Sequence, residues 1–348
     1  MVAVFLLVVL LLYGLVPASK KNVYLNICMV VLFFSMAFRH QTCYMDTLGY
    51  VQDYNSLTNV SFDKVQEYIP KDFVFWKVAK VVNSICGANY TVWLSFLALL
   101  TVIPLRHFIL KYSQNPMLSL MVYAALGFLF FSMAGLRQTL AMSATLVALV
   151  FLLEGKWAFF LLFCFIASLF HKTAVIFLPV IFLRYLPLNR YSILLYLGLA
   201  YMVPKYGEGL LTYFVELGVD ERFGAYDIGE SQISSTGLIL QIVLFVMSVV
   251  FLYNKRNDKV YRLFFMMAFI GIVMQSMAFL IAEMFRASMY YSIVNIILFA
   301  NAMESLGRKG RAIKLAMLVL LIAFCAISNN VNLYEPYYFF FQSPSLVK

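Results

Sequence analysis

Long apolar runs alternate with short polar turns along nearly the whole chain. A helix needs roughly 20 apolar residues to cross a membrane. Windows of this length predict about twelve transmembrane helices, with a range of ten to fourteen, near residues 1–17, 23–39, 91–105, 117–134, 136–153, 157–170, 173–185, 191–204, 236–253, 261–281, 285–303 and 312–328. The pattern therefore predicts an all-α, polytopic membrane protein with a single integral membrane domain over residues 1–348.

Composition supports this class and excludes a soluble domain. Hydrophobic residues make up 64% of the chain and charged residues only 12%, whereas a soluble domain has about 25% charged residues. The net charge is +10, but the basic residues are spread in small groups rather than gathered in one patch. We therefore expect no nucleic-acid partner.

The distribution of basic residues predicts the orientation of the helices. If Lys20 and Lys21 are cytoplasmic, the alternating inside loops and their immediate flanks hold 15 of the 26 lysines and arginines, while 13 of the 16 acidic residues fall outside. Cytoplasmic loops of membrane proteins are enriched in Lys and Arg in this way. Both termini are then expected to face outward. The first apolar run lacks the basic start of a signal peptide, so we interpret it as a span.

Two of the predicted outside loops are long, at residues 40–90 and 205–235. Within the first, residues 62–85 are amphipathic, with Lys77 and Lys80 on one side, and we expect this segment to lie at the membrane interface. The same loop contains Cys43 and Cys86. The sequence is compatible with a disulfide between them and with two free thiols.

Cations recur at the outer ends of the predicted spans, although Lys and Arg elsewhere in the chain are concentrated in the predicted cytoplasmic loops. Charged residues at such positions are functional candidates by default, and arginine binds phosphate with two parallel hydrogen bonds. An outward-facing group of this kind predicts a site for a phosphate-bearing ligand, with the candidates Arg39, Arg137, Lys172, Arg222 and Arg286.

Each candidate also has a simpler explanation. A single Arg137 or Arg286 could extend to the outer lipid headgroups, and Glu283, three residues before Arg286, could pair with it. His171 alone fits a hydrogen-bonded turn histidine, and Asp46 fits a solvated loop carboxylate. The number of cations at one side favours the anion site over these explanations.

No soluble-enzyme motif, zinc-spaced cysteine pair or carboxylate cluster within a span is visible. We therefore expect no metal and no cofactor. Tyr50 and Tyr54 follow Asp46 at four-residue steps, on one helix face, where they are candidates for stacking on sugar rings.

Several segments resemble the EpsG-like members of the Wzy-type polysaccharide polymerases. The most specific is residues 135–180, with "GLRQT" before one span and "SLFHK" before another. The segments "FRHQTCYMDTLGYVQDYN" (38–55), "FRASMYY" (285–291) and "NLYEPYYFF" (332–340) also resemble the family. Tyr44 and Met45 precede Asp46, where family members often have glycine.

The resemblance implies a polymerase that joins polyprenyl-diphosphate-linked oligosaccharide repeat units on the outer face of the bacterial plasma membrane, which is the inner membrane in a Gram-negative cell. The product would be O-antigen of lipopolysaccharide, capsule or exopolysaccharide. The implied partners are the lipid-linked donor and acceptor, membrane lipids and a chain-length regulator protein. The resemblance also implies a fold similar to that of GT-C-type glycosyltransferases.

The same resemblance assigns roles to the candidates. Arg137 and Arg286 would contact the diphosphate, supported by Arg39, Lys172 and Arg222. His171 or Asp46 would be the catalytic base or would orient the acceptor. Tyr50, Tyr54 and Tyr290 would contact sugars.

Three other classes of membrane protein remain open from the sequence. A flippase for the same lipids would need a similar number of helices, but its cations would line a central cavity. A membrane acyltransferase would use a histidine such as His171 beside an acid or amide. A secondary transporter would show inverted repeats or broken helices, and neither is evident in the sequence.

Overall fold

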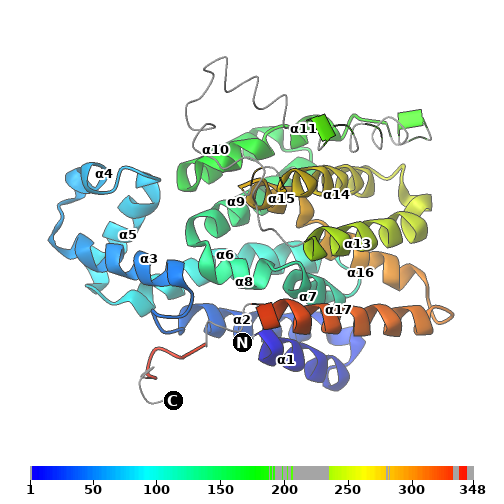
Figure 1. The fold of residues 1–348 in the computed structure, drawn as a ribbon, viewed down its shortest axis with the longest axis horizontal. Helices are drawn as coiled ribbons and strands as arrows, with labels where there is room; N and C mark the ends of the chain where they lie inside the picture. Colours follow the sequence, from blue (N-terminus) through cyan, green and yellow to red (C-terminus); the bar gives the residue numbers. More distant parts are fainter. Residues whose placement is uncertain are drawn as a thin grey trace. The chain divides into compact units, whose positions relative to one another are not determined.

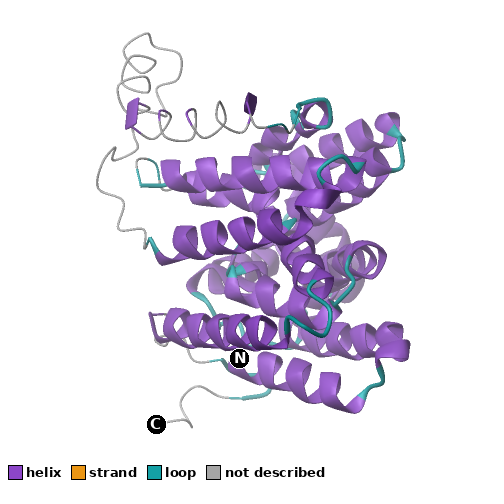
Figure 2. Cartoon of the chain, turned by 90° about the vertical axis from the view of Figure 1, so that its right-hand side faces the viewer, coloured by secondary structure: helices purple, strands orange, loops and turns teal. Residues whose placement is uncertain are grey.

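The apolar runs form helices in the computed structural model, which describes residues 2–187, 235–279, 281, 283–331 and 337–342, with a few isolated positions between 189 and 206. All secondary-structure elements of this described part are helices (Figures 1 and 2). The one other feature of these residues is an isolated antiparallel bridge between Arg39 and Phe339. The prediction of an all-α fold is confirmed over these residues.

The chain divides into two compact units, which are described separately below. The first unit comprises Met1–Val175 with Arg308–Lys348, and the second comprises Ile176–Gly307. The prediction of a single membrane domain stays a prediction.

The first unit contains most of the helices. Within it α9 packs against α6 and α10, while α2 packs against α6. Its α-helices are α1 (Val2–Leu15), α2 (Lys21–Ala37), α3 (Met45–Ser56), α4 (Val65–Tyr68), α5 (Phe73–Cys86), α6 (Tyr90–Tyr112), α7 (Pro116–Ala125), α8 (Phe128–Ala134), α9 (Leu136–Leu153), α10 (Trp157–Phe170) and α17 (Arg311–Val331).

In the second unit, α14 packs against α15, and α13 packs against α16. The hydroxyl of Ser305, the last residue of α16, donates to the carbonyl of Phe251 near the end of α13 at 3.2 Å. The described α-helices of this unit are α11 (Val180–Leu183), α13 (Thr236–Leu252), α14 (Lys259–Met277), α15 (Glu283–Ser292) and α16 (Asn295–Ser305).

Four described helices are long and apolar enough to cross a membrane. They are Tyr90–Tyr112, Leu136–Leu153, Thr236–Lys255 and Lys259–Met277. The pair α7 and α8 is a further candidate, bent by 61° at a break containing Gly127, whose positive φ of 79° suits glycine. Further apolar helices, such as α2 and α10, are shorter. The count of about twelve spans and the orientation of the termini stay predictions.

Two predicted spans are broken rather than continuous. Residues 117–134 form α7 and α8, and residues 285–303 fall on α15 and α16. The second long loop, residues 205–235, lies almost wholly outside the described residues. Both breaks are interruptions within apolar sequence, which hydrophobicity alone does not reveal.

The first long loop is a folded helical segment with its own core. The rings of Tyr54 and Trp93 stack with centroids 5.6 Å apart, and Phe75 packs edge-on against Trp93. Most of the amphipathic segment 62–85 forms α5, whose buried face includes Phe75, Trp76 and Ala79. This apolar face packs in a protein core, because α3 and α6 supply apolar partners for it. The position of the segment at the membrane interface stays a prediction.

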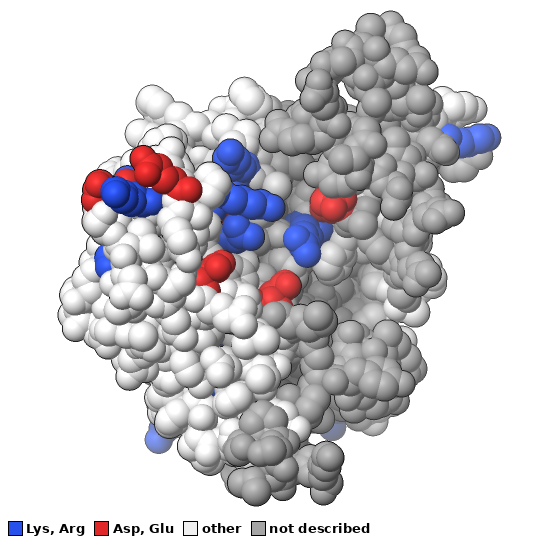
Figure 3. Space-filling view, turned by 60° about the vertical axis from the view of Figure 1, so that its left-hand side comes forward, with Lys and Arg blue, Asp and Glu red and all other residues white. Residues whose placement is uncertain are grey.

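The first long loop also contains polar and charged side chains outside this core. The ammonium of Lys80 donates to the carbonyl of Leu57 at 2.9 Å. Cys43 is buried and Cys86 is exposed, and the structure has no disulfide between them. In Figure 3, which brings forward the side of the molecule where Figure 1 shows α3, α4 and α5, basic side chains lie among acidic ones.

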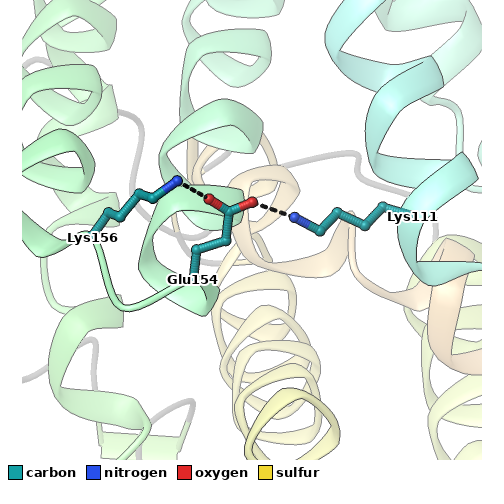
Figure 4. Close-up of polar contacts among 3 residues, drawn as sticks. All are labelled: Lys111, Glu154 and Lys156. Carbon is teal, nitrogen blue, oxygen red and sulfur yellow. Dashed lines mark hydrogen bonds and ion pairs between the residues drawn. The ribbon is translucent and has the colours of Figure 1, made fainter.

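A group of three charged residues joins the end of α6 to the turn between α9 and α10. The carboxylate of Glu154 accepts from Lys111 through one oxygen and from Lys156 through the other, the latter at 2.7 Å (Figure 4). These hydrogen bonds, first that from Lys111 and then that from Lys156, lower the pKa of Glu154 to about 2.

We expect Glu154→Gln to lower the melting temperature only slightly, because exposed ion pairs contribute little and are screened by salt. Since the pKa of Glu154 is lowered on folding, its contribution is complete above the ordinary glutamate pKa and is lost as the pH falls toward 2. Thermal unfolding in detergent at neutral and acid pH measures this. A loss equal to that of the core variant Trp93→Ala would contradict the expectation.

Candidate functional site

The carboxylate of Asp72 joins two side chains that are far apart in the sequence. Its Oδ2 lies 3.0 Å from Nη1 of Arg137 and 3.2 Å from Nδ1 of His171. The Asp72 side chain is 3% exposed, against 21% for Arg137 and 17% for His171. The carboxylate is therefore enclosed, while the two basic side chains retain partial access to the surroundings.

Local backbone structure places each member of this group. Asp72 precedes α5 with a φ of 54°, in the left-handed region that aspartate and asparagine tolerate better than most residues. His171 follows the last turn of α10 in an extended conformation, and its N–H closes that turn on the carbonyl of Ala167 at 3.0 Å. Arg137 lies in the first turn of α9.

Gly135, two residues before Arg137, lies close to the Phe131 ring. A Cβ atom on Gly135 would lie 2.6 Å from Cζ of the Phe131 ring. Gly135 forms the corner between α8 and α9, and Arg137 lies in the first turn after it.

Tyr50 of α3 provides a second contact for Arg137. Nε of Arg137 donates to the Tyr50 hydroxyl at 3.2 Å, and the guanidinium carbon lies 5.6 Å from the centre of the ring. The guanidinium is thus held by a carboxylate through Nη1 and by a phenol through Nε.

The charges within the group stabilise one another. Burial raises the pKa of Asp72, but the hydrogen bond from His171 and the charge of Arg137 outweigh burial, so its pKa lies below the usual aspartate range. Asp72 is therefore ionised at neutral pH and can only accept hydrogen bonds. Nδ1 of His171 must then carry a proton, and in the neutral ring Nε2 is the acceptor.

Arg39 is placed differently from the sequence prediction. The sequence assigned it a supporting contact to a diphosphate, but it is 1% exposed and donates to backbone carbonyls, those of Met36 and, at 3.0 Å, Met133. These carbonyls end α2 and α8, where a positive charge is favoured. The structure gives Arg39 a structural position.

Of the predicted sugar contacts, Tyr54 is fully buried, and its hydroxyl donates to the carbonyl of Gly87 at 3.0 Å. It is a packing residue of the loop core, whereas Tyr50 is partly accessible beside Arg137. Asp46 is exposed in the first turn of α3, and Lys172 is exposed beside His171.

The remaining candidates belong to the second unit. Arg286 is exposed on α15, and Tyr290 of the same helix is buried. Arg222 lies outside the described residues. In the described part of the chain, no three or more His, Cys, Asp and Glu side chains are grouped to hold a metal ion.

Asp72 is the residue that sequence reasoning missed. It lies within the amphipathic segment 62–85, at "KDFVFW" (71–76), and immediately precedes α5. A carboxylate immediately before an amphipathic helix was the available signal.

Comparison with known proteins gives one family. The sequence profile of the EpsG family matches residues 22–342, a range that includes Tyr50, Asp72, Arg137 and His171. No curated protein and no solved structure matches the chain.

Proposed function

The chain belongs to the EpsG family, and from this premise we propose that it is a polymerase that joins polyprenyl-diphosphate-linked oligosaccharide repeat units on the outer face of the bacterial plasma membrane. The product is O-antigen, capsule or exopolysaccharide. The observation that carries the proposal is the group of Arg137, Asp72 and His171, which combines a phosphate-binding side chain with a histidine held by a carboxylate.

Arg137 is suited to the leaving group. When an acceptor hydroxyl attacks the anomeric carbon of the donor, the bond from that carbon to the diphosphate oxygen breaks, and negative charge develops on the diphosphate. A fixed guanidinium stabilises this charge in the transition state. Arg137 also lies in the first turn of α9, where the backbone of the helix favours an anion as well.

His171 is suited to the acceptor. With Nδ1 held by Asp72, the free Nε2 accepts the proton from the sugar hydroxyl as the new glycosidic bond forms. Asp46 is an alternative base, but its side chain is exposed and would orient a sugar hydroxyl less well. Tyr50 lies beside Arg137, where its ring is available to a sugar near the diphosphate.

The proposal also includes candidate contacts that rest on the sequence alone. Arg286, Lys172 and Arg222 are further candidates for the diphosphate, and Tyr290 for a sugar. A chain-length regulator and the surrounding lipids are the proposed partners.

The test is complementation of a host that makes the lipid-linked repeat unit but lacks its polymerase. We expect the wild-type gene to produce a ladder of long chains, and the empty vector to leave only single repeat units. Single units in both strains would contradict the proposal. Restoration of export in a host lacking the flippase would favour that alternative class, and transfer of an acyl group to the repeat unit would favour an acyltransferase.

A further inference from the structure

Residues 337–342, here called the C-terminal segment, lie against the turn that follows α2. Phe339 and Arg39 form the antiparallel bridge, flanked by hydrogen bonds from the N–H of His40 to the carbonyl of Tyr338 at 2.8 Å and from the N–H of Phe340 to the carbonyl of Phe38 at 2.9 Å. Figure 1 shows this segment in red beside the blue turn between α2 and α3.

Side chains extend the contact in both directions. The hydroxyl of Tyr337 donates to the carbonyl of Ser35 at 2.9 Å. The sulfur of Cys43 lies 3.1 Å from the N–H of Tyr338 and 3.2 Å from its carbonyl oxygen. Cys43 is 1% exposed beneath the segment.

Arg39 connects this segment to the corner that carries Arg137. Its guanidinium reaches the carbonyl of Met133, and the hydroxyl of Thr47 donates to the same carbonyl at 3.2 Å. Gly135 and Arg137 follow two and four residues later. Thr47 also lies three residues before Tyr50, on the face of α3 that contacts Arg137.

Arg39 has no carboxylate partner among the described residues. Its two terminal nitrogens donate separately to the last turns of α2 and α8, so the planar guanidinium joins both helix ends at once. A side chain that served only as a positive charge would not need this geometry.

We propose that Arg39 and the C-terminal segment together form a positioning device, which fixes the corner between α8 and α9 and so holds Arg137 toward the substrate. Arg39 is a positioning residue and does not touch the diphosphate. The inference rests on the proposed function for its kinetic test, whereas the docking of the segment is measured independently.

The docking test uses Cys43 as a reporter in full-length protein carrying Cys86→Ser, which removes the exposed thiol. We expect a membrane-impermeant maleimide to leave Cys43 unlabelled. Phe340→Pro removes the N–H that binds Phe38, and we expect it to make Cys43 reactive. The control is Tyr68→Ala, outside the C-terminal segment, because that ring is 54% exposed, and we expect it to leave Cys43 unlabelled.

The kinetic test measures polymerisation of purified lipid-linked repeat units, normalised to folded protein. We expect Arg39→Lys and Phe340→Pro to lower kcat by roughly 10-fold or more, because small displacements of a catalytic group have large effects. The KM for the donor should change by less than about twofold. A purely structural role would reduce the amount of folded protein and leave kcat per folded molecule unchanged.

Several results would overturn the inference. If Arg39→Lys keeps kcat and raises KM, the residue is a diphosphate contact. If Phe340→Pro exposes Cys43 but leaves kcat unchanged, or leaves Cys43 protected, the segment does not position Arg137. A wild-type protein that makes no polymer would instead overturn the proposed function, and this inference with it.

Discussion

Arg137→Ala is expected to abolish the polymer ladder and to lower kcat/KM by on the order of 10²–10³-fold, the range seen when one stabilising donor is lost from a transition state. The variant removes the guanidinium that we propose stabilises the developing charge of the diphosphate. It also leaves the enclosed carboxylate of Asp72 without its nearest cation. The measurement is the length distribution of surface polysaccharide together with turnover by purified protein.

Two controls separate charge from geometry. Arg137→Lys keeps the charge but loses the fork that reaches both Asp72 and Tyr50, so we expect an intermediate loss of roughly 10-fold. Arg106→Ala removes an arginine of the same unit that binds Asn26 at 2.6 Å, and we expect a complete ladder from it. A complete ladder from Arg137→Ala at equal abundance would contradict the proposed role.

The helices were predictable because the apolar runs are long and are separated by charged turns. The runs at 91–105 and 136–153 fall on α6 and α9. The breaks were not predictable, because α8 and α16 begin within apolar sequence, and their ends depend on packing rather than on polarity. The positive φ of Gly127 marks one such break.

The site was predictable in part for a similar reason. Arg137 and His171 stood out as charged or titratable residues at the ends of apolar runs, and both lie in the segment with the most specific resemblance. Asp72 is 99 residues from His171 in the chain, so only the folded loop shows that they meet.

Arg39 shows how burial and backbone contacts change the interpretation of a cation at the end of a span. Its position at the end of a span suggested an exposed cation, but its donors satisfy the carbonyls of two helix ends. Whether an arginine at such a place binds a ligand or ends a helix depends on which backbone carbonyls come within reach. The sequence does not contain this information at short range.

Asp72→Asn should lower kcat by on the order of 10²-fold, at the lower end of what general base catalysis contributes. Asparagine has nearly the same shape and also tolerates the left-handed backbone at this position, so the variant isolates the loss of charge. Without the carboxylate, neither Nη1 of Arg137 nor Nδ1 of His171 has an anionic acceptor. Turnover by purified protein measures the effect.

The matched control for this variant is Asp63→Asn, the same change at an exposed position of the same loop. We expect it to keep wild-type turnover. Equal losses from the two variants would show that the loop as a whole, rather than the carboxylate of Asp72, is required.

The pH dependence of stability gives a second measurement. Because the pKa of Asp72 is lowered in the folded protein, its ionisation stabilises the fold above the ordinary aspartate pKa, and this contribution is lost as the pH falls through the lower, folded value. Asp72→Asn should remove that part of the acid dependence of unfolding and leave the curve near neutral pH parallel to wild type. An unchanged acid profile would contradict the ion pair.

The double variant of Asp72→Asn and Arg137→Ala tests whether the two residues act as a unit. Since Asp72 acts partly through Arg137, the combined loss of turnover should be smaller than the product of the separate losses. Stability should move the other way: Arg137→Ala leaves an enclosed carboxylate short of positive charge, and neutralising it with Asp72→Asn should recover part of the lost melting temperature. Multiplicative losses of turnover without recovery of stability would mean that the contact between the two side chains is incidental to both residues.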